Sequence, residues 1–144
     1  MSEPTLDYDP IHATIYQALC LASCAHTALD GLKDQWTDSR SAEAARRLSA
    51  QLAQEKIFSA RDIGALKQVL ELLNGMVDAG WRVQVIADPH SVEGAYVDHV
   101  LTPEAERLRE KIWPVQELHA TLLRLERLRR MEQVAVTLRG QDMS

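Results

Sequence analysis

The sequence contains few of the residues that build turns, disulfides or aromatic binding surfaces. Among its 144 residues there are six glycines, five prolines and two cysteines, and 5% are aromatic. Scarce glycine and proline disfavour a fold made of many short strands and tight turns. Cys20 and Cys24 stand one helical turn apart. A disulfide at that spacing would remove little chain entropy, so we expect reduced thiols.

Signals for membrane insertion, export and catalysis are also missing. No uninterrupted apolar run approaches the roughly 20 residues that cross a bilayer, and the acidic N-terminus lacks a signal-peptide profile. We therefore expect a cytoplasmic protein with no membrane contact. There is no glycine-rich phosphate loop, nucleophile elbow or dinucleotide-binding fingerprint. The sequence thus favours a non-enzymatic protein, for which we expect no catalytic residue, cofactor or metal ligand.

The composition is that of one globular domain with an uneven distribution of charge. Apolar residues make up 46% and charged residues 26% of the chain, and the net charge is −5. A chain of this length forms one ordinary core without disulfides or metals. Residues 103–139 hold eight Lys or Arg and six acidic residues, so the C-terminal segment is basic and the remainder acidic. This balance disfavours a nucleic-acid binder that uses its whole surface.

The most regular pattern is a four-three repeat of apolar residues in the first third of the chain. Its members are Ile11, Ile15, Ala18, Ala22, Ala25, Leu29, Leu32 and Trp36. Such spacing keeps one helical stripe against a partner helix. Asp9 as N-cap and Pro10 predict the start of this helix, which we expect to span 9–34. The central alanines allow close approach of a neighbour.

A second apolar stripe runs from Ile63 to Val77 and predicts a helix over residues 60–79. Ser59 and Asp62 have the spacing of a capping box, and Phe58 and Ile63 that of a hydrophobic staple. We expect this stripe to be the intramolecular partner of the first helix. A shorter helix is predicted between the two, at residues 42–55.

Residues 81–101 allow two interpretations. Alternating apolar residues on either side of Asp88-Pro89 favour a small β-hairpin, and an irregular crossover is equally compatible. A hairpin would have to lie on the helices or against another subunit, because two isolated strands are weak in water. Two Asp–His pairs in this segment, near His90 and His99, are a weak candidate for a metal site or an acid–base pair.

The last predicted helix starts at Thr102 and Pro103 and ends near Arg139, before Gly140. Pro114 either kinks it or divides it into two helices. Beyond Pro114 the apolar stripe changes sides. Val115, Leu118, Leu122 and Leu125 lie within about 80° of one another on a helical wheel. Leu128, Met131, Ala135 and Leu138 lie nearly opposite.

We therefore predict an all-α fold, a mostly antiparallel bundle of four to five helices with a possible hairpin at 81–101. Residues 1–8 form a polar tail, 9–139 a single domain and 140–144 a second tail. The long helices are expected at 9–34, 60–79 and 115–139, and their similar lengths suit one shared core.

The leading functional hypothesis is an interaction or regulatory protein that acts by helix-to-helix association. The stripe of Leu128, Met131, Ala135 and Leu138 would form an exposed apolar patch in a monomer, so we expect a homodimer or a helical protein partner.

Two other hypotheses remain open. A nucleic-acid-binding regulator would use Arg124, Arg127, Arg129 and Arg130, although Glu126 is interleaved with them and few aromatics are present for stacking on bases. A small metal or redox protein would use the thiols of Cys20 and Cys24, which alone are too few ligands for a zinc site.

Overall fold

The computed structural model describes residues 9–54 and 59–142 of the chain. These residues form mostly helices with one small two-stranded antiparallel sheet. The elements are, in order, α1 (Pro10–Gly31), α2 (Ser39–Leu52), α3 (Ala60–Asp78), β1 (Trp81–Ala87), β2 (Ala95–Leu101), α4 (Pro103–Lys111) and α5 (Trp113–Asp142).

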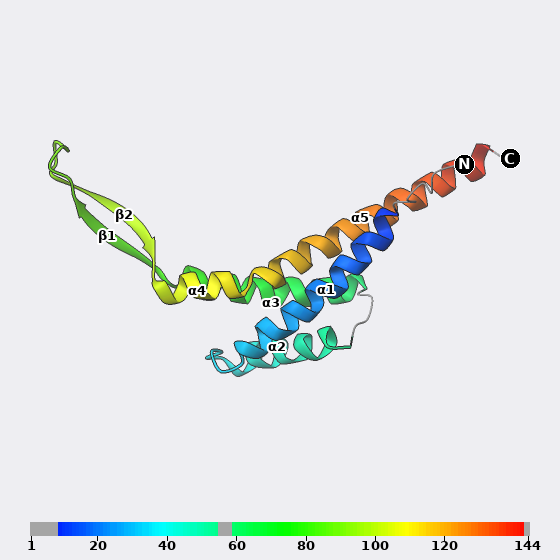
Figure 1. Ribbon diagram of the computed structural model, residues 1–144, viewed down its shortest axis with the longest axis horizontal. Coiled ribbons are helices and arrows are strands. Elements are labelled where there is room, and N and C mark those ends of the chain that lie inside the picture. The colour runs from blue at the N-terminus through cyan, green and yellow to red at the C-terminus, as the bar shows by residue number, and fades with distance from the viewer. Residues whose placement is uncertain (1–8, 55–58, 143–144) are drawn as a thin grey trace, which may run out of the picture.

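The molecule is elongated, with helices in the middle and a projection at each end (Figure 1). The hairpin of β1 and β2 extends from one end, and the C-terminal part of α5 extends from the other. Between them, α1 crosses α5, while α2 and α3 lie beneath. Within the described part of the chain, no helix is long and apolar enough to span a membrane.

The apolar repeat of α1 is confirmed as a buried stripe, but its main partner is α5 and not α3. Asp9 caps the helix by accepting from the backbone N–H of Ile11 and His12. The small side chains of Ala18, Ala22 and Ala25 are buried where α1 meets α5. Sequence periodicity suggested the α3 stripe because both stripes are apolar with the same spacing. The tertiary contacts show that α3 packs on α2, α4 and α5 instead.

Helix α2 starts three residues earlier than expected, and α3 starts as predicted. Asp38 accepts from the backbone N–H groups of Arg40 and Ser41, which fixes the start of α2 at Ser39. The capping box of α3 is present: Ser59 Oγ accepts from Asp62 N, and the carboxylate of Asp62 accepts from Ser59 N. Phe58, the other half of the expected staple, and the predicted end of α2 at Glu55 lie outside the described residues.

Residues 81–101 form a hairpin, so the crossover alternative is wrong. β1 and β2 pair in antiparallel register, from Trp81 opposite Leu101 to Ala87 opposite Ala95. At its tip, Asp88 N donates to Gly94 O at 3.0 Å, and Gly94 has a φ of 76°, a backbone conformation that glycine adopts without strain. The hairpin points away from the helices instead of lying on them (Figure 1).

The last helical segment is two helices. Helix α4 begins at Pro103 with Thr102 as N-cap and ends at Lys111. Pro114 lies in the first turn of α5, where its missing N–H costs no helical hydrogen bond. The predicted end near Arg139 is wrong, because α5 continues through Gly140 to Asp142. Glycine lowers helix propensity without forcing a helix to stop.

The core lies between the helices and includes the first half of α5. Its largest fully buried side chains include Leu32, Leu48, Leu66, Leu73, Ile112 and Leu118. Both the first α5 stripe and the α1 stripe belong to this one cluster. The second α5 stripe does not.

Candidate functional site

The second half of α5 projects from the helical body. We call residues Arg127–Gln141 the α5 arm. Every residue from Arg129 to Gln141 is exposed, including Met131 at 67% and Leu138 at 56%. By contrast, Leu125, one turn before the arm, is 3% exposed and belongs to the core. The change of stripe predicted from the sequence therefore coincides with the point where α5 leaves the body.

The apolar residues of the arm form one side of the helix. Leu128, Met131, Ala135 and Leu138 follow the four-three spacing, and Val134, 58% exposed, widens the stripe. Val136 is also exposed but lies on another side of the helix. The predicted apolar interaction residues therefore share one side of the helix, where Leu128 is half-buried and Met131, Ala135 and Leu138 are exposed.

The four candidate arginines do not share one face. Arg129 lines a small cavity between α5 and the start of α3, next to Ser59 and Ile63. Arg124, Arg127 and Arg130 follow one another at three-residue spacing and lie within about 120° of one another on another side of the helix. Arg130 also donates to the carboxylate of Glu126 at 2.6 Å. Three of the four arginines therefore share one side of α5, and one of these three is paired with Glu126.

The hairpin presents a second exposed apolar surface. Because side chains alternate along a strand, the register puts one set of residues on a common face. We call this set the apolar hairpin face: Trp81, Val83, Val85, Ala87, Ala95, Val97, His99 and Leu101. Val83, Val85 and Val97 are 60–69% exposed, so the described helices of the same chain do not cover them. The opposite face carries Arg82, Gln84 and Asp98 together with Ile86, Tyr96 and Val100.

The two Asp–His pairs of this segment do not converge. His90 lies in the tip turn, where its backbone N–H donates to Asp88 at 3.0 Å. His99 stands opposite Val83, four residues from the tip end of β2, while Asp98 is on the other face of the hairpin. Among the residues that the structure describes, no group of three or more His, Cys, Asp or Glu side chains is placed to hold a metal ion.

The two cysteines are free and exposed on the outer side of α1. Tyr16, one turn before Cys20, is 71% exposed and continues the same strip of the helix. The thiols are therefore accessible to solvent.

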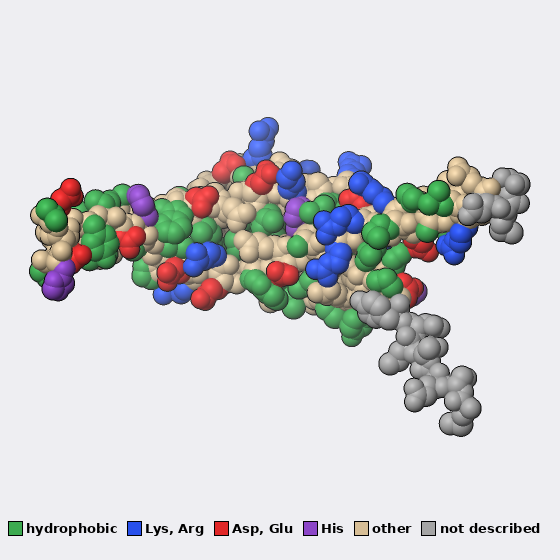
Figure 2. Space-filling model, turned by 90° about the horizontal axis from the view of Figure 1, so that it is seen from above, with side chains coloured by type: hydrophobic (Ala, Val, Ile, Leu, Met, Phe, Trp, Pro, Cys, Tyr) green, Lys and Arg blue, Asp and Glu red, His purple; other side chains and the backbone are tan. Residues whose placement is uncertain are grey.

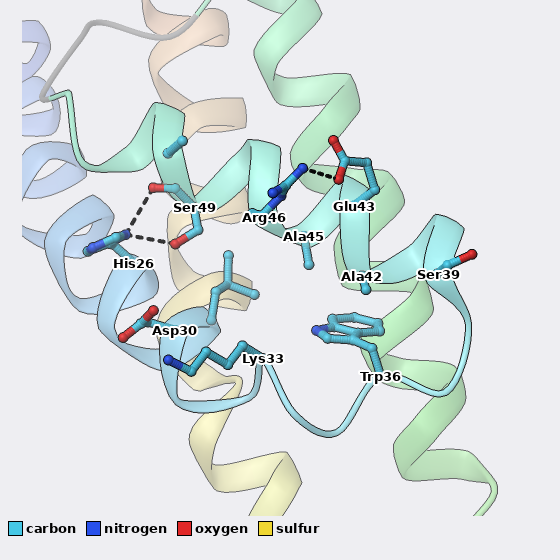
Figure 3. A pocket seen from close by; sticks show the side chains of 12 residues that line it. His26, Asp30, Lys33, Trp36, Ser39, Ala42, Glu43, Ala45, Arg46 and Ser49 are labelled. Carbon is cyan, nitrogen blue, oxygen red and sulfur yellow. Dashed lines mark hydrogen bonds and ion pairs between the residues drawn. The ribbon is translucent and has the colours of Figure 1, made fainter.

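A cavity of about 520 Å³ between α1 and α2 was not found from the sequence (Figure 3). Its floor is mostly apolar, with Leu29, Trp36 and Ala45, and Lys33 and Arg46 are among its polar lining residues. At one end, His26 Nδ1 lies 2.8 Å from Ser49 Oγ and 2.9 Å from Ser49 O, which joins α1 to α2 (Figure 3). His26 and Ser49 are 23 residues apart in the sequence, so no local pattern predicts their contact.

Trp36 contributes a buried donor beside this cavity. Its indole Nε1 has no hydrogen-bond partner among the described residues. Such a donor normally meets an acceptor when it is buried. Glu43 on the rim is already engaged by Arg46 and Arg47, and these hydrogen bonds hold its pKa below the ordinary value. At one end of the cavity, His26 and Ser49 place an imidazole nitrogen beside a hydroxyl group.

His119 has a displaced pKa. It lies on α5, half-buried. Partial burial, followed by the positive charge of Lys67 on α3, lowers the pKa of His119 below its ordinary value, while Glu71 opposes the shift. The shift favours a neutral imidazole near the core.

No known protein-family model matches this chain. No curated protein sequence and no solved structure matches it either. The functional assignment therefore depends on the geometry alone. That geometry offers two uncovered apolar surfaces, the α5 arm and the apolar hairpin face, at opposite ends of the molecule (Figure 2).

Proposed function

We propose that this protein is a non-enzymatic interaction protein that acts by association of its α5 arm, with a second copy of the chain as the partner. The observation that carries the proposal is the continuation of one helix from the core into solvent with a stripe of uncovered apolar side chains. In this proposal the remaining helices are an antiparallel bundle that serves as the scaffold for the arm.

The length of the arm supports the proposal. Isolated helices shorter than about 12–15 residues are marginal in water, and their stability in proteins comes from packing of an apolar face. The arm has a length in this range, carries three β-branched residues and a glycine, and is exposed from Arg129 to Gln141. A partner that covers Leu128, Met131 and Leu138 stabilises it.

The composition of the arm also fits an interface. Methionine, leucine and arginine on an exposed helix are typical of helical surfaces that bind another protein. Scattered single apolar residues on a surface are ordinary, but a contiguous stripe marks a contact site. The arginines around it favour solubility and orientation of the partner.

Sedimentation equilibrium of the full chain at tens of micromolar tests the proposal. We expect a reversible dimer in the unchanged protein. The double variant Met131→Gln/Leu138→Gln removes two apolar side chains of the stripe while it keeps helix propensity. It is expected to weaken dimerisation by about tenfold or more, because each buried apolar side chain contributes about 1.5–3 kcal/mol.

The matched control is Val136→Gln, an exposed apolar residue of the arm that lies off the stripe. This variant is expected to dimerise like the unchanged protein. A chain that sediments as a monomer throughout this concentration range contradicts the proposal. So does a dimer that the double variant leaves unchanged.

A further inference from the structure

We propose that the α5 arm of one copy docks on the apolar hairpin face of a second copy. The inference rests on the proposed function, because it names the surface that the arm meets. The sequence predicted association between helices, whereas this inference specifies a contact between a helix and a sheet.

The apolar hairpin face is not covered by the described helices of its own chain. A two-stranded sheet is at best marginally stable alone in water and is normally supported by further strands or by a helix. In this structure the base of the hairpin reaches the core through Leu101, but Val83, Val85 and Val97 lie beyond the helices and remain exposed. A helix laid on that face supplies the missing layer.

The distribution of charge favours contact of the hairpin with an α5 arm over contact with a second hairpin. From Trp81 to Leu101 the chain has three acidic residues and one basic residue, Arg82. The α5 arm has four arginines and one glutamate. Contact between two arms, or between two hairpins, would place like charges together, while contact between arm and hairpin joins opposite charges. Figure 2 shows acidic side chains at the hairpin end and both basic and acidic ones over the body and arm.

The two surfaces also agree in length. The apolar stripe from Leu128 to Leu138 spans about 15 Å along the helix axis, at about 1.5 Å per residue. The hairpin from Trp81 to Ala87 spans about 20 Å, at about 3.3 Å per residue. The stripe therefore fits within the face, and the bulky Trp81 stands at the end nearest the body.

The positions of the two surfaces allow a closed dimer. Arm and hairpin project from opposite ends of one elongated molecule (Figure 1). When two copies lie antiparallel, each hairpin is next to the arm of the other copy. The same contact then forms twice around a two-fold axis, which doubles the buried surface and leaves no end open for further growth.

Two matched pairs of full-length variants test the docking. Val85→Lys places a charge in the apolar hairpin face, and Gln84→Lys places the same charge on the opposite face one residue away. Met131→Lys and Gln133→Lys are the corresponding pair on and off the arm stripe. Val85→Lys and Met131→Lys are each expected to weaken dimerisation by about tenfold or more. The two controls should change it by less than about fivefold, the usual range for an exposed charge.

The results separate this inference from the proposed function. If Met131→Lys weakens dimerisation and Val85→Lys does not, the docking on the hairpin is wrong and association through the arm stands. If neither variant has an effect, both are wrong. Circular dichroism of each variant establishes that the helical body is intact.

Disulfide trapping gives a second measurement that does not depend on a disruptive variant. In a background of Cys20→Ser and Cys24→Ser, one protein carries Val97→Cys and the other Ala135→Cys. The two are mixed in equal amounts and oxidised. We expect the main covalent dimer to join the two different proteins. Covalent dimers formed mainly between identical proteins overturn the docking.

Discussion

Gly80 and Ala105 lie so close together that no side chain fits between them. A Cβ atom at Gly80 would overlap Cβ of Ala105, and it would lie 3.0 Å from Thr102 Oγ1 and 3.2 Å from Val77 O. At the same place, Thr102 N donates to Gly80 O at 2.9 Å. This contact joins the end of α3 to the start of α4 and holds the two ends of the hairpin together.

Gly80→Ala is therefore expected to destabilise the protein by about 1–3 kcal/mol, the usual cost of forcing a methyl group into a filled space. Urea denaturation followed by circular dichroism measures the change. Gly75→Ala in α3 is the matched control, because a Cβ there meets no atom within 4 Å. It should raise stability by about 0.5–1 kcal/mol through its higher helix propensity. Equal effects of the two substitutions would contradict the close contact.

The alanines of α1 make a second prediction. Ala22 is 1% exposed where α1 crosses α5, so a larger side chain must push the two helices apart. Ala22→Leu is expected to cost about 1–3 kcal/mol. Ala13→Leu, an exposed position on the same helix, should leave the unfolding midpoint nearly unchanged. A stable Ala22→Leu protein would show that α1 and α5 are not in close contact.

The capping box of α3 predicts a dependence of stability on pH. The backbone N–H of Ser59, and then its hydroxyl, donate to the carboxylate of Asp62 and hold its pKa below the ordinary value of 3.8. A lowered carboxylate pKa contributes stability that is present above pH 3.8 and is lost as the pH falls through the pKa of the folded state.

Asp62→Asn should therefore be less stable than the unchanged protein at neutral pH, and the difference should shrink in acid below pH 3.8. Ser59→Ala removes the other half of the box and should cost about 1 kcal/mol at neutral pH. Unfolding midpoints measured across the pH range give both results. A difference between the Asp62→Asn protein and the unchanged one that does not vary with pH would rule out the charged form of Asp62 as the stabilising species.

Local signals explain which parts of the fold could be predicted. The caps at Asp9, Ser59 and Thr102 depend on neighbouring residues only, and each was found from a few letters of sequence. The change of side of the apolar stripe in α5 was also predicted, because it depends only on the positions of residues around one helix. The apolar stripe of the arm was therefore predicted, and its role as an interaction site stays a prediction.

Other features depend on contacts between distant segments. The stripes of α3 and α5 are both apolar with helical spacing, so periodicity does not distinguish which of them meets α1. The His26–Ser49 contact and the cavity beside it require the placement of α2 against α1. Strand alternation indicated the hairpin as one of two alternatives, and it contains nothing about the direction in which the hairpin leaves the body. Its exposed apolar face was therefore missed.

The open edges of the hairpin have a further consequence. β1 and β2 pair with each other alone, so the outer side of each strand keeps backbone N–H and C=O groups that no strand satisfies in the described part of the chain. A helix docked on the apolar hairpin face covers side chains and leaves these groups in water. Strand addition from another chain, the first step of fibril growth, is thus a competing route at high concentration. In the proposed dimer, pairing with the arm would limit this route by holding the hairpins of neighbouring molecules apart.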